Sequence, residues 1–108
     1  MSNFYQDASA SSSAIATTVA PGRAWQLKQV SCHLDAGGAA GAFTVTMDAA
    51  SGALFDALLY TTSMASVTSL VKTFNPPIEM KAGDEVDIAY ANGSSAAYGV
   101  TVVWRDSN

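Results

Sequence analysis

The feature that most constrains the fold is a stretch of alternating side chains between residues 78 and 91. Apolar residues occupy every second position of 78–80 and of 86–90, with polar or small residues between them. A two-residue period is typical of a half-buried strand, because successive side chains point to opposite faces of a sheet. Gly83 can take a positive φ and Asp84 can bond its own backbone, so the chain is expected to reverse between the two runs. This stretch predicts an antiparallel β-sandwich.

Other segments repeat this pattern, and turns rich in Gly, Pro, Ser or Asn separate them. Strands are expected over residues 14–20, 24–34, 42–48, 53–61, 67–74 and 97–105, beside those of the stretch above. Short strands at even spacing indicate a sandwich or barrel rather than alternating strands and helices. We therefore predict an all-β chain that forms a single antiparallel β-sandwich of about eight strands.

Three local features refine this prediction. In residues 24–34 the apolar parity switches near Lys28 and Gln29, which is what a β-bulge does. In residues 53–61 apolar side chains fall on both parities, so this strand is buried on both faces or lies at an interface. A short helix is the alternative there, because Ala and Leu favour helices; the β-rich surroundings favour a strand. Residues 92–95 are expected to form the last hairpin loop.

The N-terminal residues are expected to form a flexible arm, residues 1–13, ahead of a sandwich domain, residues 14–108. The run of Ser and Ala in residues 9–13 cannot bury much apolar surface, so the arm alone is expected to be disordered. Phe4 and Tyr5 lie near its start. These two aromatic side chains are either incidental or a docking tag for a neighbouring subunit.

The composition limits the classes of partner. The chain has 108 residues, enough for one domain. Only 13% of residues are charged, against about 25% in typical domains. Either Ser, Thr, Ala and Gly make up much of the surface, or other subunits cover part of it. The net charge is −4 and the five basic residues are scattered, so nucleic acid is not an expected partner.

The sequence also bears on the compartment. Cys32 is the single cysteine, so no intrachain disulfide is expected. The first twenty residues lack the basic and apolar regions of a signal peptide. No apolar run approaches the roughly 20 residues of a membrane span. We expect a protein made in a cytoplasm, without a membrane partner.

No catalytic, cofactor-binding or metal-binding residues are expected. His33 and Cys32 are sequence neighbours on a predicted strand, so their side chains point to opposite faces and cannot form a nucleophile–base pair. A single histidine excludes the usual Cys/His zinc sites. Asp84, Glu85 and Asp87 match no spaced calcium-binding motif, and Asp84 is interpreted as a turn former.

Four aromatic residues could serve a different purpose. Trp25 and Trp104 lie in phase with apolar neighbours, which favours core or interface packing. The alternative is a ligand platform that stacks sugars on Trp25, Tyr90, Tyr98 or Trp104.

Several motifs carry a resemblance to a known group of proteins. They are Trp25-Gln26-Leu27 at the start of a long strand, residues 43–48 followed by residues 51–53, residues 77–92, and Tyr98-Gly99-Val100. The run from Trp25 to Trp104 resembles small β-sandwich (jelly-roll-like) virion proteins of tailed bacteriophages. The resemblance implies a structural role: such proteins decorate or cement capsids, usually as trimers on the outer shell, and have no catalytic residue.

On this basis we expect a capsid decoration (cement) protein that is made in the host cytoplasm and located on the virion. Its partners would be the major capsid protein and two further copies in a homotrimer. The expected capsid contacts are Phe4 and Tyr5 in the arm. The expected subunit interface is Leu54, Phe55 and Tyr60, on the segment with apolar residues of both parities. The alternative is a carbohydrate- or receptor-binding module of a phage tail or fibre; a hydrolase is remote because no triad, metal set or acid pair is apparent.

Overall fold

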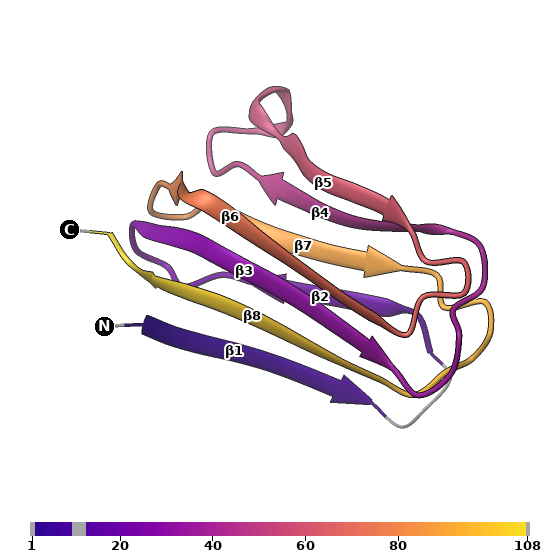
Figure 1. Ribbon diagram of the computed structural model, residues 1–108. Helices are drawn as coiled ribbons and strands as arrows, with labels where there is room; N and C mark the ends of the chain where they lie inside the picture. Colours follow the sequence, from indigo (N-terminus) through magenta and orange to yellow (C-terminus); the bar gives the residue numbers. More distant parts are fainter. Residues whose placement is uncertain (1, 10–12, 108) are drawn as a thin grey trace.

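The computed structural model describes residues 2–9 and 13–107, and of residues 2–9 it describes the backbone alone. Eight strands in these residues form two antiparallel sheets of four strands each, stacked as a sandwich (Figure 1). The strands are β1 (Ser2–Ser9), β2 (Ile15–Val19), β3 (Trp25–Leu34), β4 (Ala42–Asp48), β5 (Ala57–Ser63), β6 (Ser69–Met80), β7 (Glu85–Tyr90) and β8 (Tyr98–Asp106). One turn of 3-10 helix, η1 (Ala53–Phe55), lies between β4 and β5.

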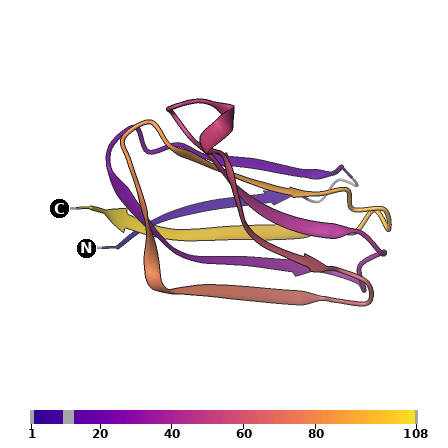
Figure 2. The ribbon, with the colours of Figure 1, turned by 90° about the horizontal axis from the view of Figure 1, so that it is seen from above.

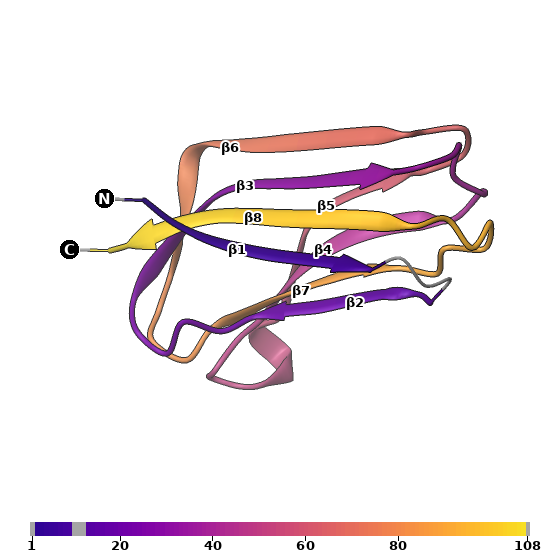
Figure 3. The same cartoon turned by 90° about the horizontal axis from the view of Figure 1, so that it is seen from below.

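The strand order is that of a jelly roll. One sheet has the order β1-β8-β3-β6 and the other β2-β7-β4-β5, so every connection except that between β4 and β5 crosses from one sheet to the other. Figure 3 shows β6, β3, β8 and β1 side by side in one layer, and Figure 2 shows the two layers from above. The predicted all-β, antiparallel sandwich is confirmed.

The core lies between the two sheets and follows the predicted alternation. In β7 the side chains of Val86, Ile88 and Tyr90 are buried, while their neighbours face outward. In β3 the buried positions change parity across Lys28, where the pairing with both β6 and β8 shifts register. The β-bulge predicted near Lys28 and Gln29 is therefore confirmed.

Two predicted strands have different boundaries. Residues 53–55 form η1, and the strand begins only at Ala57, so the helical alternative holds for one turn. The strand predicted over residues 67–74 begins only at Ser69 and continues to Met80 as one long strand, β6, which passes through a cis peptide bond at Asn75–Pro76. β6 is the outer strand of its sheet, which is where prolines are tolerated because no neighbour needs their missing N–H groups.

The prediction of a flexible arm over residues 1–13 is wrong for most of its length. Ser2–Ser9 forms β1, which pairs antiparallel with β8 along its whole length, from Ser2 opposite Arg105 to Ser9 opposite Tyr98. The composition predicted disorder because it reflects only how much apolar surface a segment can bury. β1 is instead held by backbone hydrogen bonds to β8. Residues 10–12 lie outside the described residues.

The hairpin predicted at residues 92–95 is also wrong, because β7 and β8 belong to different sheets. The loop between them crosses the end of the sandwich and is organised by the buried side chain of Asn92. Its Nδ2 donates to the carbonyl oxygens of Ser13 and Ala96, each at 2.9 Å, and its Oδ1 accepts from the Ala96 N–H at 3.2 Å. Asn92 takes a φ of 55°, a conformation that Asn tolerates better than most residues.

Two loops are joined at the same end of the sandwich by a close approach at Gly38. The Gly38 N–H donates to Val67 O at 3.0 Å, and the Ser66 N–H donates to Gly38 O at 2.8 Å. A Cβ on Gly38 would lie 2.4 Å from Met64 O, closer than real contacts allow.

Within the residues that the structure describes, no helix is long and apolar enough to cross a bilayer.

Replacing Gly38 by Ala is expected to destabilise the fold by about 1–3 kcal/mol, because the added methyl group forces backbone apart. Gly37→Ala is the matched control, since a Cβ there would meet nothing closer than Ser66 Cα at 3.6 Å. Urea unfolding of both variants measures the difference. Equal midpoints for the two variants would show that the loop junction is not tight.

Burial of Cys32 makes stability depend on alkaline pH. The side chain is buried, and this desolvation raises the pKa of the thiol to about 11. As pH rises, the thiol ionises in the unfolded chain before it ionises in the folded protein. The free energy of unfolding is therefore unaffected by this thiol below about pH 9, and it falls by about 2 kcal/mol as pH rises towards 11. We expect wild type to lose more stability than Cys32→Ala between pH 8 and pH 10.5 in urea unfolding. Parallel pH profiles would contradict this.

Candidate functional site

Most of the large apolar side chains that reach the surface lie in one region of the molecule. Among the described residues, four are more than half exposed: Leu54 at 95%, Phe55 at 61%, and Leu58 and Val71 at 58% each. Three of these belong to η1 and the start of β5. Residues 49–56, which we term the spur, project from one end of the sandwich as a loop beyond β4 and β5 (Figure 1). Exposed apolar residues gathered in this way mark a contact surface.

Hydrogen bonds fix the spur at its base. The Asp56 carboxylate accepts from the Ala49 N–H at 2.8 Å, which closes the loop on itself. Inside it, the Gly52 N–H donates to Ala49 O at 3.1 Å, and the Phe55 N–H donates to Gly52 O at 3.0 Å. Gly52 has a φ of 117°, a conformation that favours glycine. Leu54 and Phe55 are therefore presented by an ordered loop.

The buried carboxylate of Asp84 ties the spur to the rest of the sandwich. Its Oδ1 accepts from the Ala50 N–H of the spur at 2.9 Å, and its Oδ2 accepts from the Lys81 N–H at 2.9 Å. The backbone oxygen of Asp84 accepts from Trp25 Nε1 at 3.1 Å. The prediction that Asp84 forms the turn is confirmed, and the contact with Ala50 adds a role that local sequence does not show.

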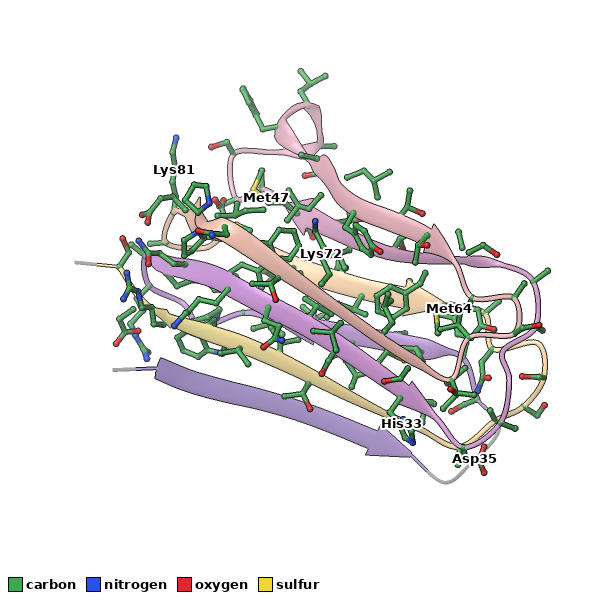
Figure 4. All side chains as sticks on the ribbon, viewed as in Figure 1. His33, Asp35, Met47, Met64, Lys72 and Lys81 are labelled. Carbon is green, nitrogen blue, oxygen red and sulfur yellow. The ribbon has the colours of Figure 1, made fainter. Side chains whose placement is uncertain are left out.

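A cavity of about 450 Å³ lies between the spur and the turn from β6 to β7. It is lined by Met47, Ala49, Ser51, Phe55, Lys81 and Asp84. Figure 4 shows Met47 and Lys81 at the end of the sandwich that carries the spur. The Asp84 carboxylate already accepts two backbone N–H groups, so beside its apolar side chains the cavity offers Ser51 and Lys81.

Tyr60 does not join Leu54 and Phe55. In β5 the pairing shifts between Val45 and Thr46, so Leu59 is an extra residue between Leu58 and Tyr60. Leu58 therefore faces outward, whereas Tyr60 is half-buried. The Lys72 Nζ atom lies 5.2 Å from the centre of the Tyr60 ring and 5.6 Å from that of the Phe74 ring. The bulge explains why apolar residues fall on both parities here. Sequence reasoning left out Leu58 because the bulge depends on β4.

The four aromatic residues of the alternative platform are all buried. The exposed fractions are 0% for Trp25, 2% for Tyr90, and 9% for both Tyr98 and Trp104. The two tryptophan rings pack edge to face at 5.8 Å, and the Tyr90 hydroxyl donates to Ala39 O at 2.8 Å. These rings have no free face for a sugar, so the platform prediction is wrong. The physical reason is their phase, which matches that of the core residues.

The capsid contact predicted for Phe4 and Tyr5 concerns side chains that lie outside the described residues. Their backbone pairs with Val103 and Val102 in β8. Both residues are therefore part of a sheet.

Polar side chains near the termini form a network on the opposite sheet. The Ser107 hydroxyl donates to Glu79 at 2.7 Å, and Gln26 Nε2 donates to the second Glu79 oxygen. These two hydrogen bonds lower the pKa of the Glu79 carboxyl. Arg105 Nε donates to Gln26 Oε1 at 2.6 Å and completes a link across β8, β3 and β6.

The residues that could serve in catalysis or metal binding do not lie together among the described residues. His33 is exposed on the outer face of β3 and Cys32 is buried on the inner face, as predicted. Across residues 2–9 and 13–107, no three His, Cys, Asp or Glu side chains lie where they could hold a metal ion together. The arrangement at the spur suits binding through apolar contact.

Comparison with known proteins does not assign a family: no family model matches the chain, and no curated protein matches it.

Removing the Asp84 carboxylate is expected to destabilise the protein. Asp84→Ala removes the hydrogen bonds that its carboxylate accepts from the Lys81 and Ala50 N–H groups, at a cost of about 0.5–1.5 kcal/mol for each of these part-buried bonds. Asp48→Ala is the control, because Asp48 is exposed and its loss is expected to change stability by less than about 0.5 kcal/mol. Equal losses in urea unfolding would contradict the role given to Asp84.

Proposed function

We propose that this protein is a non-enzymatic structural protein of a virion, a phage capsid decoration (cement) protein that binds the major capsid protein and stabilises the head. The observation that supports this best is the spur, an ordered loop that holds Leu54 and Phe55 out from a compact jelly roll. The sequence pattern predicted a subunit interface for these two residues; here we assign them to the capsid contact instead. The resemblance of residues 25–104 to phage virion proteins supplies the setting.

The strength of such a contact favours a repeated surface as its partner. Burying one large apolar side chain contributes about 1.5–3 kcal/mol. Association itself costs about 4 kcal/mol or more, so a contact made by Leu54 and Phe55 alone is weak. A capsid presents the same site many times, and linked copies of this protein would gain from each other's binding. A homotrimer, of about 33 kDa from chains of 11.1 kDa, is part of this proposal.

The carbohydrate-binding alternative is not carried forward. It depended on Trp25, Tyr90, Tyr98 or Trp104 as an exposed platform, and all four are buried.

The test is binding of the purified protein to capsids of the phage that encodes it, measured by gradient sedimentation. We expect wild type to sediment with the capsids. The double variant Leu54→Ser/Phe55→Ser is expected to lose at least about tenfold in affinity, because it removes the exposed apolar tip of the spur. Val71→Ser, which changes an exposed apolar residue on another strand, is expected to bind as wild type.

Two outcomes would count against the proposal in different ways. Wild type that stays at the top of the gradient, away from every capsid, overturns the decoration function. Capsid binding that the double variant retains in full leaves the function standing and removes the spur from the contact.

A further inference from the structure

The two sheets leave four strands with an open edge, and these edges differ. β1 and β6 border one sheet, and β2 and β5 border the other. An edge strand presents unpaired N–H and C=O groups that can pair with another chain. Proteins commonly protect such edges with charged residues, prolines or shortness.

β6 carries these protections and β5 carries few of them. Along β6 lie Lys72, Pro76, Pro77 and Glu79. β5 is seven residues long, Ala57–Ser63, and contains no charged residue, proline or glycine. The bulge at Leu59 interrupts its edge once, and the residues from Tyr60 to Ser63 continue without a further register shift.

The other two edges are weaker candidates. β2 has five residues, and its outward positions hold only Ala16 and Thr18, the second of which donates to Asp87 at 2.7 Å. β1 includes Asp7. The exposed apolar residues also lie elsewhere, because Leu54, Phe55 and Leu58 all precede or begin β5.

We infer that a second copy of this chain packs against the open edge of β5, with β5 facing β5 about a two-fold axis. A two-fold contact brings the same surface from both partners together, so it requires a surface that tolerates itself. Each copy carries a net charge of −4. Between residues 49 and 63 the single charged residue is Asp56, and its carboxylate already accepts the Ala49 N–H.

A second charge at this side is the ammonium of Lys72 on β6, which lies 5.2 Å from the Tyr60 ring and is opposite in sign to Asp56. The side therefore does not gather charges of one sign. The outer face of the same sheet, by contrast, holds Asp48 opposite Glu85, with Asp87 two residues further along. The contact would cover Leu58 near the start of β5, while Leu54 and Phe55 at the tip of the spur stay assigned to the capsid contact. The inference goes beyond the proposed function and does not depend on the protein being part of a virion.

The test compares lysine substitutions at two apolar residues that are equally exposed to solvent. Leu58 on β5 and Val71 on β6 are each 58% exposed, so a lysine at either position is expected to leave the fold intact, which circular dichroism checks. Light scattering over a range of concentrations then gives the mass of wild type, Leu58→Lys and Val71→Lys. We expect Leu58→Lys to have half the mass of wild type, and Val71→Lys to match wild type.

The halving is expected whether or not a trimer forms through another surface. A pair of about 22 kDa would fall to a single chain of 11.1 kDa, and a pair of trimers would fall to one trimer. Amide hydrogen exchange gives a second readout: β5 amides of wild type are expected to become more protected as concentration rises, and those of Leu58→Lys are not.

Three results would overturn the inference. They are wild type that is a monomer at every concentration, Leu58→Lys with the mass of wild type, and equal loss of mass in both lysine variants. A protein that binds capsids and yet remains a monomer would refute this contact while leaving the proposed function intact.

Discussion

The hydrogen bonds of Asp84 are the contact on which one end of the molecule depends. This one residue connects the spur at Ala50, its own turn at Lys81 and the first residue of β3 at Trp25, and so it joins parts of both sheets. A carboxylate that is only 6% exposed is costly unless it is fully hydrogen-bonded, and here the partners are backbone groups that would otherwise lack acceptors. The core begins directly beside it, where Trp25 packs against Trp104.

The opposite end of the sandwich is held in a comparable way by neutral groups. Asn92 bonds to Ser13, two residues before β2, and to Ala96, two residues before β8. Gly38 allows the loop after β3 and the loop after β5 to touch. Because both ends are tied across the sheets, the body can present the spur as an ordered surface. The binding properties proposed for Leu54 and Phe55 depend on this order, since a mobile loop would lose entropy on every contact.

The chain has few charged residues, and some of its cations lie over aromatic rings. Lys72 covers the rings of Tyr60 and Phe74 at the open side between β5 and β6, and Arg23 lies over Trp104 and pairs with Asp106 at 2.5 Å. These cations shield aromatic surface that would otherwise meet water. On the same side, Leu54, Phe55 and Leu58 stay more than half exposed to solvent.

Alternation of apolar and polar residues by itself determined the strands β3, β4, β7 and β8, their inward residues and the bulge near Lys28. The types of residue at Gly83 and Asp84 determined the turn there. Each of these features depends on residues close together in the chain. Only the tertiary structure decided which sheet each strand joins, why residues 92–95 cross between sheets, and that Ser2–Ser9 completes an edge. It also decided that Leu58 faces water while Tyr60 faces inward, since the bulge at Leu59 is defined by pairing with β4. Strand pairing is a contact between distant parts of the chain, and local pattern does not record it.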